Sequence, residues 1–132
     1  MNQIAKWCVL LMGCALAPWS QAADTNPQAQ LQRWQAQAQS PASAGRGQVF
    51  FTTKRQHDWS CATCHNAPPT TPGKHVKTQK IIRPMAPSSN DQAFTSQRKV
   101  DKWFRRNCND VVGRECTAQE KADVLAYLLS VR

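Results

Sequence analysis

The pentapeptide CATCH, residues 61–65, limits what this chain of 132 residues can fold into more than any other feature. C-x-x-C-H is the attachment site of c-type haem. Two thiols three residues apart on a helical turn can add to the two vinyl groups along one edge of a porphyrin, and the adjacent imidazole then points at the iron. The motif occurs once. We therefore expect one covalently bound haem c, attached to Cys61 and Cys64, with His65 as the proximal axial ligand of the iron.

A second pair of cysteines, Cys108 and Cys116, leaves an alternative open. Together with Cys61 and Cys64 it would supply the four thiolates of a structural zinc site, although such a site leaves His65 unexplained. A thioredoxin-like dithiol would need a βαβ pattern, which the sequence lacks. Free thiols are unstable in an oxidising compartment, so we expect Cys108 and Cys116 to form a disulfide.

Residues 1–22 have the pattern of a secretory signal peptide. Lys6 precedes an apolar run at 7–19, which is shorter than the about 20 residues that span a bilayer, and SQA places small residues before a cleavage point after Ala22. We expect an exported, periplasmic protein. An alternative is lipidation of Cys14, because the segment LMGC loosely resembles a lipoprotein box.

The chain is strongly basic. Its formal net charge of +9 falls to +8 when Lys6 leaves with the signal peptide. An exported protein meets no genomic nucleic acid, so the charge indicates acidic partner proteins, an anionic membrane surface, or only a well-solvated face. The basic side chains form two clusters: Lys74, Lys77, Lys80 and Arg83 after the haem motif, and Lys99, Lys102, Arg105 and Arg106 on the outer face of a later helix.

The hydrophobic pattern predicts an all-α fold of helices wrapped around one haem, without alternating strands or repeats. Asn26 and Pro27 open a first helix. This helix is rich in Gln and Ala and weakly apolar, so we expect residues 23–42 to form a loosely docked N-terminal helical arm. Residues 43–132 then form the haem domain.

Within the haem domain, a second helix follows Ser43 and contains Gly47. A glycine inside a helix costs about 1 kcal/mol, which indicates a close helix crossing. Residues 66–90 hold five prolines and predict a long loop. A further helix begins near Ser96, and the capping box from Thr117 to Glu120 opens the last one.

The helix after Ser96 carries an asparagine where an apolar residue is expected. Val100, Trp103, Phe104, Asn107 and Val111 fall within an arc of about 100°. A buried amide without a partner costs about 1–3 kcal/mol. Asn107 therefore bonds a loop carbonyl or a haem propionate, or its oxygen faces the iron. Trp103, Phe104 and Val111 would form the apolar wall of the distal pocket.

Met85 competes with Asn107 for the sixth position. A single-haem class I cytochrome c usually takes a methionine sulfur from a loop between the haem motif and the last helix, and Met85 lies in such a loop. His/Met ligation gives a low-spin electron shuttle. Met85 would otherwise pack against the haem edge. His57 and His75 are weaker candidates, which would give bis-histidine iron.

The arrangement GRG-x-x-F, CATCH, I-x-P-M-A-P-S and KVDKWFRRNCNDVVGREC resembles the SHP cytochromes (sphaeroides haem protein) and their relatives that carry a DUF1924 domain, over about residues 44–130. The resemblance implies a small class I c-type cytochrome of the bacterial periplasm. It also implies that His65 is the proximal ligand, that Asn107 is the sixth ligand in the oxidised state, and that Cys108 and Cys116 form a disulfide.

The same resemblance implies that Asn107 leaves the iron on reduction, so that five-coordinate, high-spin iron binds oxygen, nitric oxide or similar small ligands. Its implied redox partners are a dihaem cytochrome c and a membrane cytochrome b. The best-known member of the family has leucine where this sequence has Met85. This difference keeps Met85 as the alternative ligand. We expect a redox and ligand-binding cytochrome rather than a dedicated enzyme, and we assign no catalytic residue.

Overall fold

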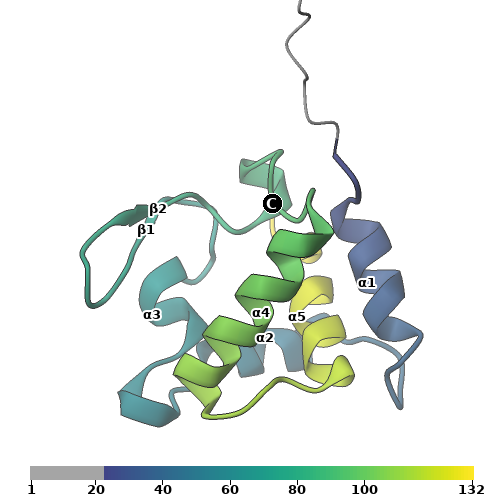
Figure 1. Cartoon of the computed structure of the whole chain (residues 1–132), viewed down its shortest axis with the longest axis horizontal. Coiled ribbons are helices and arrows are strands. Elements are labelled where there is room, and N and C mark those ends of the chain that lie inside the picture. Colours follow the sequence, from purple (N-terminus) through teal and green to yellow (C-terminus); the bar gives the residue numbers. More distant parts are fainter. Residues whose placement is uncertain (1–22) are drawn as a thin grey trace, which may run out of the picture.

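Five α-helices dominate residues 23–132, which are the residues that the computed structural model describes (Figure 1). The predicted signal peptide and Cys14 lie outside this range. No helix within it is long and apolar enough to cross a membrane. The elements in chain order are α1 (Pro27–Gln35), α2 (Ala44–Thr52), η1 (Gln56–Asp58), α3 (Cys61–His65), β1 (Gly73–Lys74), β2 (Ile81–Ile82), η2 (Pro87–Ser89), α4 (Gln97–Val112) and α5 (Ala118–Ser130).

Helices α2 and α5 cross at the centre of the fold, with their backbones in contact. A Cβ atom on Gly47 would overlap the carbonyl oxygen of Asp123 and lie 2.9 Å from the Cβ of Tyr127. Phe51 and Leu125 are fully buried in these two helices. The prediction of a close crossing at Gly47 is confirmed, and the missing side chain is what permits the approach.

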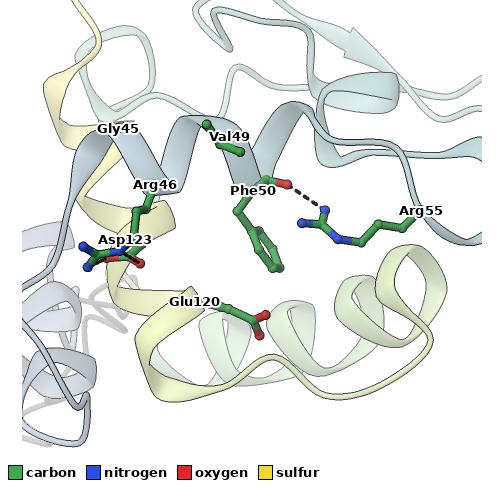
Figure 2. Close-up of a pocket in the computed structure, with 7 residues that line it drawn as sticks. All are labelled: Gly45, Arg46, Val49, Phe50, Arg55, Glu120 and Asp123. Carbon is green, nitrogen blue, oxygen red and sulfur yellow. Dashed lines mark hydrogen bonds and ion pairs between the residues drawn. The ribbon is translucent and has the colours of Figure 1, made fainter.

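A buried carboxylate ties the start of α2 to α5. Oδ1 of Asp123 accepts hydrogen bonds from the Ser43 amide at 2.7 Å and from Nη2 of Arg46 at 2.8 Å, and Oδ2 accepts from Nε of Arg46 at 2.8 Å. Figure 2 shows the side chains of Arg46 and Asp123 beside each other. Burial alone raises the pKa of Asp123. The hydrogen bonds from Arg46, Ser43 and Gln119 outweigh it and hold the pKa below its usual value.

Helix α1 packs firmly against α5, so the expectation of a loosely docked arm is wrong. Trp34 is 9 % exposed and packs with Ala122 and Leu125 of α5. Gln30 is fully buried, and its amide is satisfied because Nε2 donates to Oγ1 of Thr25 at 2.8 Å. The helix contains few apolar residues, but one large indole and one satisfied polar side chain are enough to dock it.

The predicted loop at 66–90 contains a small hairpin that the sequence analysis missed. β1 and β2 pair antiparallel, with Gly73 opposite Ile82 and Lys74 opposite Ile81. Strands of two residues are too short to show the alternation of apolar and polar side chains by which a strand is predicted from sequence. The hairpin extends from the helices on the side of α3 (Figure 1).

We predict that Gly47→Ala destabilises the protein by about 1–3 kcal/mol, the usual cost of overpacking, because the new methyl group would overlap the backbone of α5. Gly45→Ala is the matched control in the same helix. A Cβ there meets only the hydroxyl of Ser43 at 3.8 Å, so we expect unchanged or higher stability. Urea unfolding measures both, and equal stability of the two variants would contradict the close crossing.

We predict that the protein becomes less stable in acid because of Asp123. The pKa of Asp123 is lower in the folded protein than in the unfolded chain, where it is about 3.9. Its contribution to the free energy of unfolding is therefore fully present above that unfolded value and is lost as the pH falls through the folded pKa. We expect Asp123→Asn to have a lower urea midpoint than the parent at pH 7. The difference should shrink below about pH 4. A difference that is constant from pH 7 to pH 3 would contradict this role.

Candidate haem site

A cavity of about 600 Å³ lies between α3, α4 and the segment that joins them. The predicted attachment and ligand residues all line it: Cys61, Cys64 and His65 from α3, Asn107 from α4, and Met85 from the connecting segment. The volume is in the usual range for a cofactor pocket. The structure therefore brings the predicted site residues together, including both competitors for the sixth position.

A capping box fixes the short helix that carries the haem motif. Oγ of Ser60 accepts from the Thr63 amide at 3.2 Å, and Oγ1 of Thr63 accepts from the Ser60 amide at 2.9 Å. These two bonds satisfy otherwise free amides of a helix that spans only Cys61–His65. Thr63, one of the two residues between the cysteines, thus helps to form the turn that places both thiols on the cavity wall.

His65, the predicted proximal ligand, lies against a pair of tilted aromatic rings. The ring centroids of Phe51 and His65 are 6.5 Å apart, and those of Phe51 and Tyr127 are 5.5 Å apart. Burial lowers the pKa of His65, and the charge of His75 lowers it further. The imidazole is therefore neutral at pH 7, which is the form that binds a metal. Its buried Nδ1 finds no hydrogen-bond partner among residues 23–132.

The two motif cysteines are free thiols with different surroundings. Burial raises the pKa of Cys61 to about 11, although the charge of Arg55 opposes the rise. Sγ of Cys64 accepts from the Val76 amide at 3.4 Å. A Cβ atom on Gly73 would overlap the carbonyl oxygen of Cys64, so only glycine lets β1 lie against the end of α3. Two thiols beside a neutral imidazole on an apolar cavity fit c-type haem.

The zinc alternative is wrong for the described part of the chain. Cys108 and Cys116 are joined as a disulfide, with 5.6 Å between their Cα atoms. Residues 23–132 contain no group of three or more His, Cys, Asp or Glu side chains placed to hold a metal ion. The two cysteine pairs therefore do not form one site.

Helix α4 forms the opposite wall of the cavity. Val100 is buried, and Phe104, Asn107 and Val111 are half-buried on the same lining surface. Trp103 also lines the cavity but is 46 % exposed. It lies at the rim rather than inside, beside the cations of Lys102 and Arg106, which are 5.2 and 5.6 Å from its ring centroid.

The surroundings of the two candidate sixth ligands differ. The exposed Asn109 donates from its amide to the Arg105 carbonyl at 2.7 Å, whereas the side chain of Asn107 makes no hydrogen bond to any described residue. Met85 packs against the buried cluster that contains Phe51, and its amide donates to the Pro69 carbonyl at 3.1 Å. Asn107 thus lines the cavity without a hydrogen-bond partner for its side chain among residues 23–132, while Met85 packs against an apolar cluster.

The two histidines considered as alternative ligands have other contacts. Nδ1 of His75 accepts from the Thr78 amide at 3.2 Å, which holds the ring within the hairpin loop although it lines the cavity. His57 is exposed, does not line the cavity, and lies 5.2 Å from the ring of Trp59.

Four aromatic residues on the cavity wall were not predicted from the sequence: Phe50, Phe51, Trp59 and Phe94. Phe50 and Phe51 lie one turn after Gly47 in α2, and that spacing alone does not indicate a cofactor pocket. Phe50 also borders a second pocket of about 500 Å³ between α2 and α5. There Arg55 lies 4.2 Å above its ring and donates from Nη1 to its carbonyl oxygen at 2.8 Å (Figure 2). The ring of Phe50 thus lies between this second pocket and the candidate haem cavity.

Comparison with known proteins agrees with this site. Residues 37–128 match the family described as a domain of unknown function, DUF1924. The cytochrome c-type protein SHP of Cereibacter sphaeroides is 42 % identical over 123 residues, which cover 90 % of this chain and 95 % of that protein. Cytochrome c'' of Methylophilus methylotrophus is 40 % identical over 88 residues, which cover 64 % of this chain and 61 % of that protein.

The fold is also similar to solved structures. Oxidised SHP, described as an oxygen-binding cytochrome c, matches with a TM-score of 0.76 and 42 % identity, over 82 % of this chain and 99 % of that one. Oxidised cytochrome c'' from M. methylotrophus matches with a TM-score of 0.74 and 33 % identity, over 80 % and 94 % of the two chains. The predicted all-α, class I cytochrome c fold is confirmed. The chain belongs to the DUF1924 family and is a c-type cytochrome related to SHP.

Proposed function

We propose that this protein is a periplasmic, single-haem cytochrome c that carries electrons and binds a small ligand at the distal side of its iron. Haem supplies a redox-active iron whose axial ligands decide between electron transfer and ligand binding. Asn107 is proposed to hold the sixth position in the oxidised state and to give it up on reduction. The observation that carries this proposal is the unpaired amide of Asn107 on the cavity wall.

The proximal half of the cavity would hold the haem permanently. Cys61 and Cys64 would form the two thioether bonds, and the neutral imidazole of His65 would be the fifth ligand. Phe51 supports that imidazole from behind. Covalent attachment through adjacent residues keeps the haem and its proximal ligand together whatever happens at the sixth position.

The distal half favours exchange of a weak ligand. An amide oxygen is a hard donor and suits ferric iron better than ferrous iron. The wall next to Asn107 is apolar, because Phe104 and Val111 line it. A neutral diatomic such as oxygen or nitric oxide would therefore enter more readily than an anion. The relative SHP is described as an oxygen-binding cytochrome c, which supports the proposal.

A second candidate function is a low-spin electron shuttle with Met85 as the sixth ligand. The observation in its favour is that Met85 lines the same cavity as His65. Its packing against the buried core cluster is equally consistent with a role at the haem edge.

We propose that an acidic redox protein docks over the mouth of the cavity. Lys80 and Arg83 reach it from the side of the hairpin, and Lys99 and Arg106 reach it from α4. Two clusters that are distant in the sequence thus flank one opening, whose rim includes the exposed Trp103. By resemblance, the partner is a dihaem cytochrome c or a membrane cytochrome b. An anionic membrane surface is the competing occupant.

The ligand proposal predicts the spectrum of the haem-loaded protein. The reduced protein should be high-spin, and carbon monoxide or nitric oxide should change its absorption bands. Asn107→Val should convert the oxidised protein to high-spin and leave the reduced spectrum nearly unchanged. Met85→Leu should alter neither spectrum. Optical and electron paramagnetic resonance spectra measure these states.

Asn109→Val is the matched control for the asparagine variant, because Asn109 is exposed on the same helix two residues away. It should leave both spectra unchanged. A reduced protein with a sharp low-spin α band that ignores carbon monoxide would contradict the proposal. Loss of that band in Met85→Leu alone would establish the shuttle instead.

The docking proposal predicts that reduction by an acidic cytochrome slows as salt increases, because opposite charges steer the encounter. Arg83→Glu should lower the rate at low salt by about tenfold. Arg132→Glu changes the net charge equally at a residue outside the cavity lining, and its rate should stay within about twofold. Stopped-flow reduction measures the rates. A rate independent of salt, or tight binding to anionic vesicles alone, would contradict the proposal.

A further inference from the structure

Helix α4 lacks a cap of its own. Its N-cap residue, Ser96, makes no side-chain capping bond. Arg98 and Lys99 lie in its first turn, where positive charge opposes the helix dipole. The cap comes from the N-terminal arm instead: Oδ1 of Asp24 accepts from the Gln97 amide at 2.7 Å, across 73 residues of sequence. A carboxylate at this position satisfies a free amide and offsets the dipole.

The arm contacts α4 a second time, one turn further along. Nη1 of Arg33 lies 2.7 Å from Oδ1 of Asp101 in a half-buried ion pair. The same nitrogen donates to Oε1 of the buried Gln30 at 3.0 Å, and the guanidinium lies 4.2 Å from the ring centroid of Trp34. These contacts restrain Arg33, so the pair loses less side-chain entropy than an ordinary surface ion pair.

Two more contacts complete a row of anchors. The rings of Trp34 and Phe104 meet edge to face, with centroids 6.4 Å apart. Cys108 is bonded to Cys116. The anchored positions of α4 are spaced by four, three and four residues, so they follow one stripe of the helix. They are Gln97, Asp101, Phe104 and Cys108.

The part of α4 that lines the cavity overlaps the anchored stripe at Phe104 and Cys108, and it also carries Asn107. The buried residues of α4 are Val100 and Cys108. A helix with so little core packing depends on its anchors for position and rotation about its axis. The position of Asn107 on the cavity wall therefore depends on the contacts made along the anchored stripe.

We infer that the N-terminal arm, through Asp24 and Arg33, positions α4 and thereby sets how firmly Asn107 occupies the sixth position. The inference rests on the proposed role of Asn107 and deepens it. A ligand held in place loses little freedom when it binds, whereas a ligand on a loosened helix loses more. Asp24 and Arg33 are thus positioning residues of the distal site, although they do not line the cavity.

The test is the spin state of the oxidised, haem-loaded protein. Asp24→Ala removes the cap, and we expect the ratio of high-spin to low-spin iron to rise about fivefold, as for loss of a typical cap. Arg33→Gln should raise it in the same direction, and both should raise the reduction potential. Asp24→Asn keeps an acceptor oxygen and should stay within about twofold of the parent.

Asp91→Ala removes another exposed carboxylate and is the matched control, with an unchanged ratio expected. Thermal unfolding shows whether each variant is folded. If Asp24→Ala does not fold, Arg33→Gln still tests the inference. If Asn107→Val abolishes the low-spin form but Asp24→Ala and Arg33→Gln leave the spin state unchanged, this inference is overturned and the proposed ligand is not. No effect of Asn107→Val would overturn the proposed ligand and this inference together. An equal rise in Asp24→Asn and Asp24→Ala would overturn the capping geometry.

Discussion

The backbone contact between α2 and α5 at Gly47 is the constraint on which the rest of the structure depends. It places Phe51 against Tyr127 and behind the ring of His65. The buried carboxylate of Asp123 reinforces the same crossing from one end. The proximal side of the cavity is therefore built on the best-packed part of the protein, where movement would require separating two helices in contact.

The distal side is built differently. Helix α4 is held along one stripe by a cap, an ion pair, a ring contact and a disulfide, and the surface that lines the cavity overlaps this stripe at Phe104 and Cys108. Apart from the disulfide, these contacts are individually modest, and they allow small changes in position more easily than a close-packed core does. A firmly packed His65 opposite a less firmly held Asn107 would suit the proposed function, in which only the sixth position of the iron changes.

The sequence predicted the elements whose signals are local. The motif ending at His65, the capping box at Thr117 and the close approach at Gly47 each depend on residues within one turn or on one residue type. The hairpin at Gly73 was missed because its strands are two residues long. The packing of the arm was misjudged because mean apolarity says little about a helix docked by Trp34.

The sequence by itself determined which residues are expected to attach the haem, because two cysteines and a histidine at this spacing need only one helical turn to act together. It also determined that Asn107 lies on the apolar side of α4, because that follows from the helical period. The tertiary structure alone decided that Asn107 and Met85 face one cavity, and that Asp24 caps the helix that carries Asn107. Those contacts join distant segments, and no local pattern encodes which distant backbone amide a carboxylate will meet.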